Sequence, residues 1–295
     1  MPDTGSGSAL ADPVVRWFAE TARDLPWRRA DCSPWGVLVS EFMLQQTQVS
    51  RVVPAFEAWM RRWPTPGALA AEPASEAVRA WGGLGYPRRA MWLHRAAVEI
   101  VERHDGEVPA DVDALLALRG VGPYTARAVA AFAFGRRHPV VDTNTRRVIA
   151  RAVDGRGDAG PPDPRRELAA MDALLPADEP AAQAFNAGMM ELGAVACTSR
   201  SPACDRCPVA GLCAWRAAGY PAYDGPRRRA QASFAGSDRQ VRGIVMRELR
   251  AAHRPVTRAE LAPAWPDADQ LARAIDSLVA DGLAVAQPDG LALPE

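Results

Sequence analysis

The chain contains no lysine, because all 35 of its basic residues are arginine. A Schiff-base mechanism needs an amine that can lose its proton, and the arginine guanidinium stays protonated in proteins. A lysine imine is therefore excluded as a catalytic intermediate, and only the N-terminal amine could replace it. This absence rules out one class of covalent lyase mechanism before any motif is considered.

Long apolar runs and a targeting signal are also absent. No stretch of about 18 apolar residues could cross a bilayer, and the Gly/Ser-rich start lacks the pattern of a secretory signal. We therefore expect a cytoplasmic protein without a membrane partner. Separately, we expect it to act as a monomer. In a reducing compartment, the 5 cysteines favour metal ligation or inert thiols over disulfides.

Charge of one sign is not in excess, since acidic and basic residues balance at 35 each. Net charge therefore gives no indication of a nucleic-acid partner. Clusters such as Arg146-Arg147 could neutralise phosphates on one face, or they could be ordinary solvated surface.

Helical spacing of apolar residues dominates most of the chain, and strand-like alternation is rare. We therefore expect a mainly α fold. Residues 216–236 are rich in Pro, Gly, Ala and Arg, and they are predicted to form a linker.

Residues 237–295 have a different pattern. Thr257 and Glu260 form a capping-box pattern after a first helical segment. A further helix is predicted over residues 269–280, and a Pro-Asp-Gly sequence at 288–290 marks a hairpin. Three helices and a hairpin suggest a small winged-helix-like unit. The alternative is a compact helical cap that makes no DNA contact.

Four of the cysteines lie close together, separated by six, two and five residues. They are Cys197, Cys204, Cys207 and Cys213. Structural zinc sites usually present two C-x2-C pairs, and only one occurs here. Four thiolates at this spacing suit a [4Fe–4S] cluster, which is the predicted cofactor, with a zinc ion as the alternative.

Two glycines around one apolar residue, Gly120-Val121-Gly122, separate two predicted helices. They let the backbone turn sharply and expose N–H groups at the start of the second helix, where a DNA phosphate can bind. The simpler explanation is a tight interhelical turn. Asp142 follows Gly122 by 20 residues and precedes another helical stretch, so by itself it predicts a helix N-cap.

Glu41 lies in an apolar part of a predicted helix. Its neighbours include Val37, Leu38, Val39, Phe42 and Leu44. Apolar surroundings favour the uncharged carboxylic acid, which is the form that a general acid needs. The alternative is that Glu41 simply interacts favourably with the helix dipole.

Together these motifs resemble those of the MutY-type adenine DNA glycosylases, an iron–sulfur family with a helix-hairpin-helix. The resemblance covers residues 12–215. The cysteine spacing, the glycine hairpin and the aspartate also resemble endonuclease III. The run Ser-Glu-x-Met-Leu-Gln-Gln-Thr-Gln around Glu41 is distinctive of the MutY type and favours adenine as the excised base.

The resemblance implies a role for each matched catalytic position. Glu41 would protonate adenine, and Asp142 would stabilise the positively charged sugar. Asn144 would orient Asp142, although the chain has Asp-Thr-Asn where the family often has Asp-Gly-Asn. Tyr124 occupies the position of the lyase lysine of bifunctional members, which implies a monofunctional enzyme.

Other matched positions imply contacts with DNA or with the flipped base. Trp27, Arg28 and Glu191 would line the adenine pocket, and Tyr86 and Gln46 would form a wedge inserted into the duplex. The implied substrate and DNA contacts are Trp27, Arg28, Leu44, Gln46, Tyr86, Glu191, Gly120, Val121 and Gly122. The family usually has a second tyrosine after Tyr86, and this chain has Pro87.

The resemblance also implies a two-lobed helix-hairpin-helix glycosylase fold. The expected parts are a disordered N-terminus (1–11), an iron–sulfur cluster module (12–30 and 143–215), and a six-helix barrel module (31–142) with the helix-hairpin-helix at 113–134. Glu41 and Asp142 would face each other across the cleft between the lobes.

The implied partner is double-stranded DNA that contains adenine opposite 8-oxoguanine or guanine. MutY-type enzymes carry a Nudix-like domain that senses oxidised guanine, and residues 237–295 are too short for it and have a different pattern. Two alternatives stay open. One is an endonuclease III-like glycosylase that acts on damaged pyrimidines, and the other is a non-catalytic iron–sulfur DNA-binding regulator.

Overall fold

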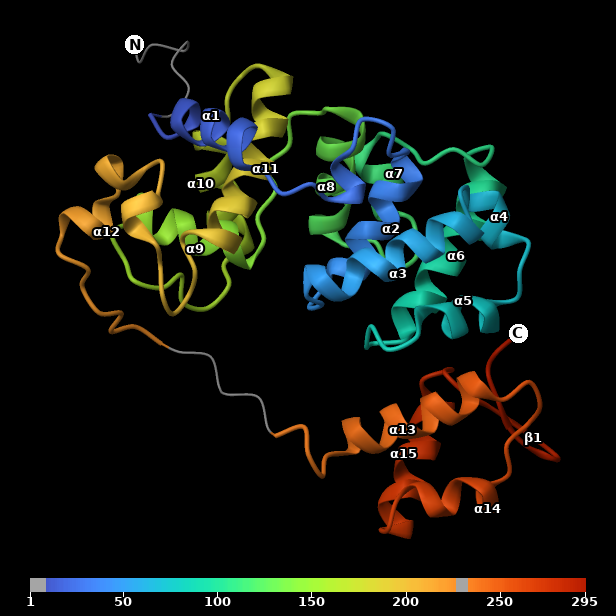
Figure 1. Ribbon diagram of the computed structural model, residues 1–295. Coiled ribbons are helices and arrows are strands. Elements are labelled where there is room, and N and C mark those ends of the chain that lie inside the picture. Colours follow the sequence, from blue (N-terminus) through green and yellow to red (C-terminus); the bar gives the residue numbers. More distant parts are fainter. Residues whose placement is uncertain (1–8, 227–232) are drawn as a thin grey trace. The chain divides into compact units, whose positions relative to one another are not determined.

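The computed structural model describes residues 9–226 and 233–295, and their ordered elements are almost all helices (Figure 1). Residues 1–8 of the predicted disordered N-terminus and residues 227–232 of the predicted linker lie outside this part of the chain. Within it, no helix combines the length and the apolar character needed to span a membrane.

The chain divides into two compact units. The first unit comprises Met1–Arg29, Ala110–Leu116 and Val121–Arg229, and the second comprises Ala30–Pro109, Ala117–Gly120 and Ala230–Glu295. The domain boundaries expected from the sequence stay predictions.

The first unit is built from short helices. Its elements are α1 (Ala11–Thr21), η1 (Pro26–Arg28), α7 (Val112–Leu116), α8 (Pro123–Phe134), α9 (Thr143–Ala152), α10 (Pro164–Leu174), α11 (Glu179–Val195), η2 (Cys204–Arg206), η3 (Ala210–Leu212) and α12 (Ala214–Ala217). Asp142, Asp163 and Asp178 cap α9, α10 and α11 by accepting hydrogen bonds from N–H groups of the first turn. These caps set where the three helices begin, because the first N–H groups of a helix have no partner within it.

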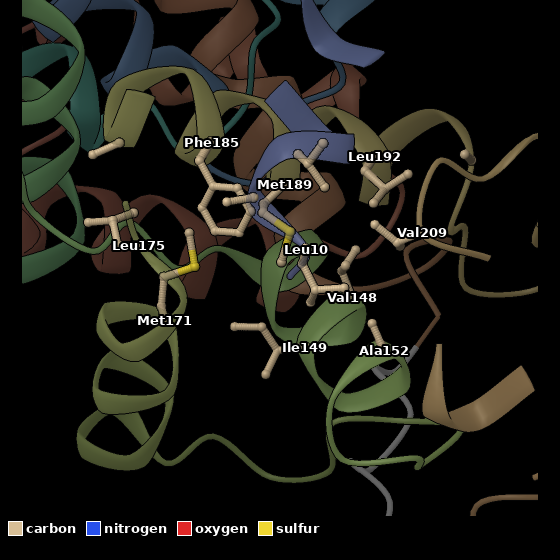
Figure 2. Packing of buried hydrophobic residues seen from close by; sticks show 14 residues of the cluster. Leu10, Val148, Ile149, Ala152, Met171, Leu175, Phe185, Met189, Leu192 and Val209 are labelled. Carbon is tan, nitrogen blue, oxygen red and sulfur yellow. The ribbon is translucent and has the colours of Figure 1, made fainter. Parts of the chain in front are cut away.

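A single apolar core joins α1, α9, α10 and α11 (Figure 2). Its larger buried side chains are Leu10, Val148, Ile149, Met171, Leu175, Phe185, Met189, Leu192 and Val209. Leu10, expected to belong to the disordered N-terminus, is part of this core because α1 packs against α11. Val209 belongs to the cysteine segment, which is therefore fastened to the core of the unit.

The second unit begins with a helix that is apolar on every side. Its first elements are α2 (Pro34–Leu44), α3 (Val49–Arg62), α4 (Pro66–Ala70), α5 (Ala74–Trp81) and α6 (Arg88–Arg103). Every residue of α2 from Trp35 to Met43 is buried. Helices with no polar face lie inside a core, and α2 thereby carries the Glu41 carboxyl into the interior.

The C-terminal part of the second unit contains the elements expected there. They are α13 (Asp238–Ala251), α14 (Arg258–Leu261), η4 (Ala262–Ala264), α15 (Ala268–Ala280), and the antiparallel strands β1 (Val285–Gln287) and β2 (Gly290–Ala292). The capping box of Thr257 and Glu260 is confirmed. Hydrogen bonds from Arg254 and Thr257 lower the pKa of Glu260 to about 2. Val256 bridges to Leu291 beside the hairpin, and the winged-helix-like assignment stays a prediction.

Candidate active site and cluster loop

Asp142 is the N-cap of α9, and its carboxylate is well defined by hydrogen bonds. Oδ1 accepts from the backbone N–H groups of Asn144 and Thr145 at 2.9 and 2.7 Å. Oδ2 accepts from Nδ2 of Asn144 at 2.9 Å. Three bonds fix the orientation of the carboxylate, while Oδ2 keeps acceptor capacity. The N-cap and the catalytic interpretations of Asp142 are therefore compatible.

Asn144 is itself held by Arg147, one turn further along α9. Arg147 donates to Oδ1 of Asn144 at 2.8 Å and to the carbonyl oxygens of Gly193 and Cys197, each at 2.7 Å. Residue 193 has to be glycine, since an added Cβ would lie 2.6 Å from the Asn144 Cβ. A continuous hydrogen-bonded chain thus connects Asp142, Asn144, Arg147 and the backbone of Cys197.

The cluster loop, residues 197–213, wraps around the buried arginine Arg151. Its guanidinium donates to Sγ of Cys197 at 3.4 Å and to the carbonyl oxygens of Thr198 and Ser199 at 2.7 and 3.1 Å. The Cys213 thiol donates to the Arg151 carbonyl oxygen at 3.6 Å. Arg151 therefore organises both ends of the loop, and its positive charge suits a cluster with thiolate ligands.

The four thiols of the cluster loop lie near one another. Burial, together with the neighbouring thiols of Cys197, Cys204 and Cys213, raises the pKa of Cys207 to about 11. The thiolates around a [4Fe–4S] cluster bind separate irons, and four neighbouring thiols fit such a cluster.

Glu191 lies on α11 with a side chain that is fully buried. Its Oε1 accepts from Nε and the backbone N–H of Arg23, and its Oε2 accepts from guanidinium N–H groups of Arg23 and Arg28, at 2.6 to 3.3 Å. Burial alone would raise the pKa of Glu191, but the two arginines outweigh it and lower the pKa. Two bonds to each oxygen fill the carboxylate, so Glu191 acts on its surroundings by holding Arg23 and Arg28.

The glycine hairpin has the backbone that its sequence predicts. Gly120 has φ +80°, and a Cβ there would lie 2.6 Å from the Trp92 Cβ, so only glycine fits. Gly122 is the N-cap of α8 and has no atom within 4 Å of a hypothetical Cβ. Val121 between them is buried. Tyr124, in the first turn of α8, packs against a small apolar cluster of Ala128, Ala131 and Val140.

Glu41 lies on α2 and is 5% exposed. Leu44 ends the same helix and is half-buried, and Gln46 follows it in an exposed turn. Glu41, Leu44, Gln46 and Tyr86 belong to the second unit. Asp142, Asn144, Tyr124 and Glu191, with Trp27, Arg28 and the four cysteines, belong to the first.

Two loops of the second unit, residues 45–48 and 82–87, are hydrogen-bonded to each other. Thr47 Oγ1 donates to the Leu84 carbonyl oxygen at 3.2 Å, and Arg51 donates to the Gly83 carbonyl oxygen. The two predicted wedge residues, Gln46 and Tyr86, are thus carried by one joined structure. Tyr86 is 49% exposed.

Comparisons with known proteins bear on both units. A family model described as "HhH-GPD superfamily base excision DNA repair protein" matches residues 39–170, and one described as "Iron-sulfur binding domain of endonuclease III" matches residues 197–213. An adenine DNA glycosylase of Mycobacterium tuberculosis is 54% identical over 283 residues, which cover 95% of this chain and 92% of that protein. The chain belongs to the adenine DNA glycosylase family.

This adenine DNA glycosylase family member is also similar to more distant glycosylases. A thymine/uracil-DNA glycosylase of Pyrobaculum aerophilum is 37% identical over 202 residues, which cover 68% of this chain and 87% of that protein. The solved structure of a thermostable thymine-DNA glycosylase has a TM-score of 0.63 at 26% identity and covers 71% of this chain and 95% of that chain. The predicted family, the helical glycosylase fold and the [4Fe–4S] cofactor are thereby confirmed.

The roles of several supporting residues could not be predicted from the sequence of this family member. Arg23 pairs with Glu191 across 168 positions, and no local pattern signals such a contact. The sequence predicts that Arg146 and Arg147 bind phosphates or lie on solvated surface, whereas in the structure they make internal contacts. Arg146 pairs with Glu167 at 2.6 Å, and its side chain is only 11% exposed.

Proposed function

We propose that the protein is a monofunctional glycosylase that removes adenine paired with 8-oxoguanine or guanine in double-stranded DNA. The observation that carries this proposal is the burial of Glu41 within α2, a helix otherwise made of apolar and small side chains. Adenine leaves deoxyribose poorly unless a ring nitrogen is protonated, and a buried carboxylic acid supplies that proton. The 54% identity to an adenine DNA glycosylase over 283 residues supports the same base.

Hydrolysis then proceeds in steps that these residues can perform. Glu41 gives its proton to the adenine ring nitrogen, and the bond between C1′ and the base breaks with its electron pair passing to the base. The sugar becomes an oxocarbenium-like cation, which the Asp142 carboxylate stabilises. Water adds to C1′ and returns a proton to Glu41, so the products are adenine and an abasic site. Asn144 keeps Asp142 oriented throughout.

DNA is bound and opened by other parts of the chain. The N–H groups that follow Gly122 at the start of α8 would bind a phosphate. Gln46 and Tyr86 would enter the duplex as the base leaves the stack. Trp27, Leu44 and Arg28 would contact the flipped adenine, with Arg28 held in place by Glu191.

The cysteine loop would hold the cofactor in the first unit. Cys197, Cys204, Cys207 and Cys213 would be the four ligands, and a bound cluster would supply iron–thiolate bonds that hold the loop in place. Arg151 would position the loop by its bonds to residues 197–199. We further propose that the enzyme works as a monomer.

Single-turnover base release tests the function. Duplexes would hold adenine opposite 8-oxoguanine, guanine, cytosine or thymine, and a second set would hold thymine or uracil opposite guanine. We expect adenine release opposite 8-oxoguanine and guanine, with strand breaks only after alkali. Release of thymine or uracil, with adenine left intact, would overturn the proposal in favour of the activity that the Pyrobaculum relative is named for.

A further inference from the structure

Arg89, in the first turn of α6, is a buried cation without an acidic partner among the described residues. It is 6% exposed, and its guanidinium contacts are the Gln45 carbonyl oxygen and the Tyr86 ring. Burial lowers the pKa of the Arg89 guanidinium. A buried charge with so little compensation destabilises a fold. Its presence therefore calls for an explanation other than stability.

The two contacts of Arg89 reach both predicted wedge loops at once. The guanidinium carbon lies 4.4 Å from the centre of the Tyr86 ring, which is a cation–π distance. The hydrogen bond to Gln45 fixes the residue directly before Gln46. Arg89 thus connects the side chain of one wedge residue to the backbone of the other.

Both wedge residues have a backbone conformation that needs support. Gln46 has φ +57° and Tyr86 has φ +48°, a left-handed region that residues other than glycine rarely occupy. Such conformations persist only where the surroundings enforce them. The side chains of Thr47 and Arg51 bond to backbone carbonyl oxygens of the 82–87 loop, and the Arg89 guanidinium contacts the Tyr86 ring itself.

We propose that Arg89 is a positioning residue that holds Gln46 and Tyr86 in the conformation in which they enter the duplex. The inference rests on the proposed function. The guanidinium fixes the ring orientation before DNA arrives, so less freedom is lost when the wedge enters the base stack. The charge is kept at a cost in stability because it preorganises the wedge.

The test compares Arg89→Met, Tyr86→Ala and the double variant with the wild type. Met keeps the volume of the side chain and removes its charge and its donors. Arg95→Met is the matched control, because Arg95 lies on the same helix with a side chain 52% exposed. The probe is a duplex with 2-aminopurine beside an adenine opposite 8-oxoguanine. Its fluorescence reports base unstacking without requiring chemistry.

We expect Arg89→Met to slow unstacking and adenine release about tenfold. The variant should unfold at the same temperature as the wild type or at a higher one. In the Tyr86→Ala background, Arg89→Met should cause no further slowing. Arg95→Met should behave as the wild type. Additive slowing in the double variant, a lowered unfolding temperature, or no effect of Tyr86→Ala would overturn the proposal. If the wild type released no adenine, the proposed function would fail, and the unstacking data would still decide the role of Arg89.

Discussion

Glu191 is a buried carboxylate that is paired with two arginines. Its oxygens receive four hydrogen bonds from Arg23 and Arg28, and its side chain has no exposed surface. The arginines are partly exposed, at 38% and 24%. Glu191 therefore fixes the two arginines, and both keep part of their surface exposed to solvent.

Replacing Glu191 with Gln should lower the free energy of unfolding at neutral pH more than at acid pH. The ion pairs stabilise the fold above the unfolded-state pKa of Glu191, and this contribution is lost as pH falls through the lowered folded-state pKa. We expect Glu191→Gln to reduce the free energy of unfolding by about 3 kcal/mol at neutral pH. The difference from the wild type should shrink in acid.

Urea unfolding at several pH values measures this difference. Glu179→Gln is the matched control, because Glu179 is an exposed glutamate on the same helix. A difference that stayed constant from neutral to acid pH would contradict the assignment of the pKa shift to these ion pairs.

At the scale of elements, α9 connects the candidate catalytic aspartate to the cluster loop. The helix begins at the cap made by Asp142, and one turn later Arg147 reaches both Asn144 and the Cys197 carbonyl oxygen. A single helix thus fixes the carboxylate and the first predicted cluster ligand together.

Removing this connection should impair catalysis more than cluster binding. Arg147→Met frees Asn144 from one of its anchors, so we expect adenine release to slow about tenfold, in line with the loss of other outer-shell contacts. The four cysteines are unchanged, so iron content should persist. Single-turnover release and the visible absorbance of the cluster measure the two effects. Arg166→Met is the control, with a side chain 58% exposed, and unchanged release from Arg147→Met would refute the connection.

Helix caps and hairpins could be predicted because each depends on residues that are close together in the sequence. The capping box of Thr257 and Glu260 and the hairpin at residues 288–290 depend on residues within a few positions of each other, and both are present. The cysteine spacing and the motif around Glu41 indicated the family for the same reason. Such patterns report short-range geometry directly.

Contacts between distant segments were not predictable from one sequence. Arg89 and Gln45 are 44 positions apart, and Arg147 and Cys197 are 50. The sequence around these arginines does not distinguish a buried arginine from an exposed one, and only the packing of the folded chain shows that they are internal. The candidate catalytic residues could therefore be named from motifs, whereas the side chains that position them required the fold.

For the whole molecule, the composition makes a chemical prediction. Because the chain has no lysine, we expect no covalent enzyme–DNA complex when borohydride is added during turnover, and no strand nicking without alkali. Gel analysis of the trapped and untrapped reactions measures both. A bifunctional, lysine-containing endonuclease III serves as the positive control. A trapped complex would implicate the N-terminal amine and end the monofunctional assignment.

The most direct test of the catalytic account is single-turnover adenine release by Asp142→Asn on an adenine:8-oxoguanine duplex, with DNA binding measured on the same duplex. Asn keeps the shape of the cap but removes the charge that stabilises the sugar cation. We expect release to fall at least about a hundredfold while DNA binding is retained. Release at a rate near that of the wild type would show that Asp142 is only a helix cap, and it would contradict the mechanism.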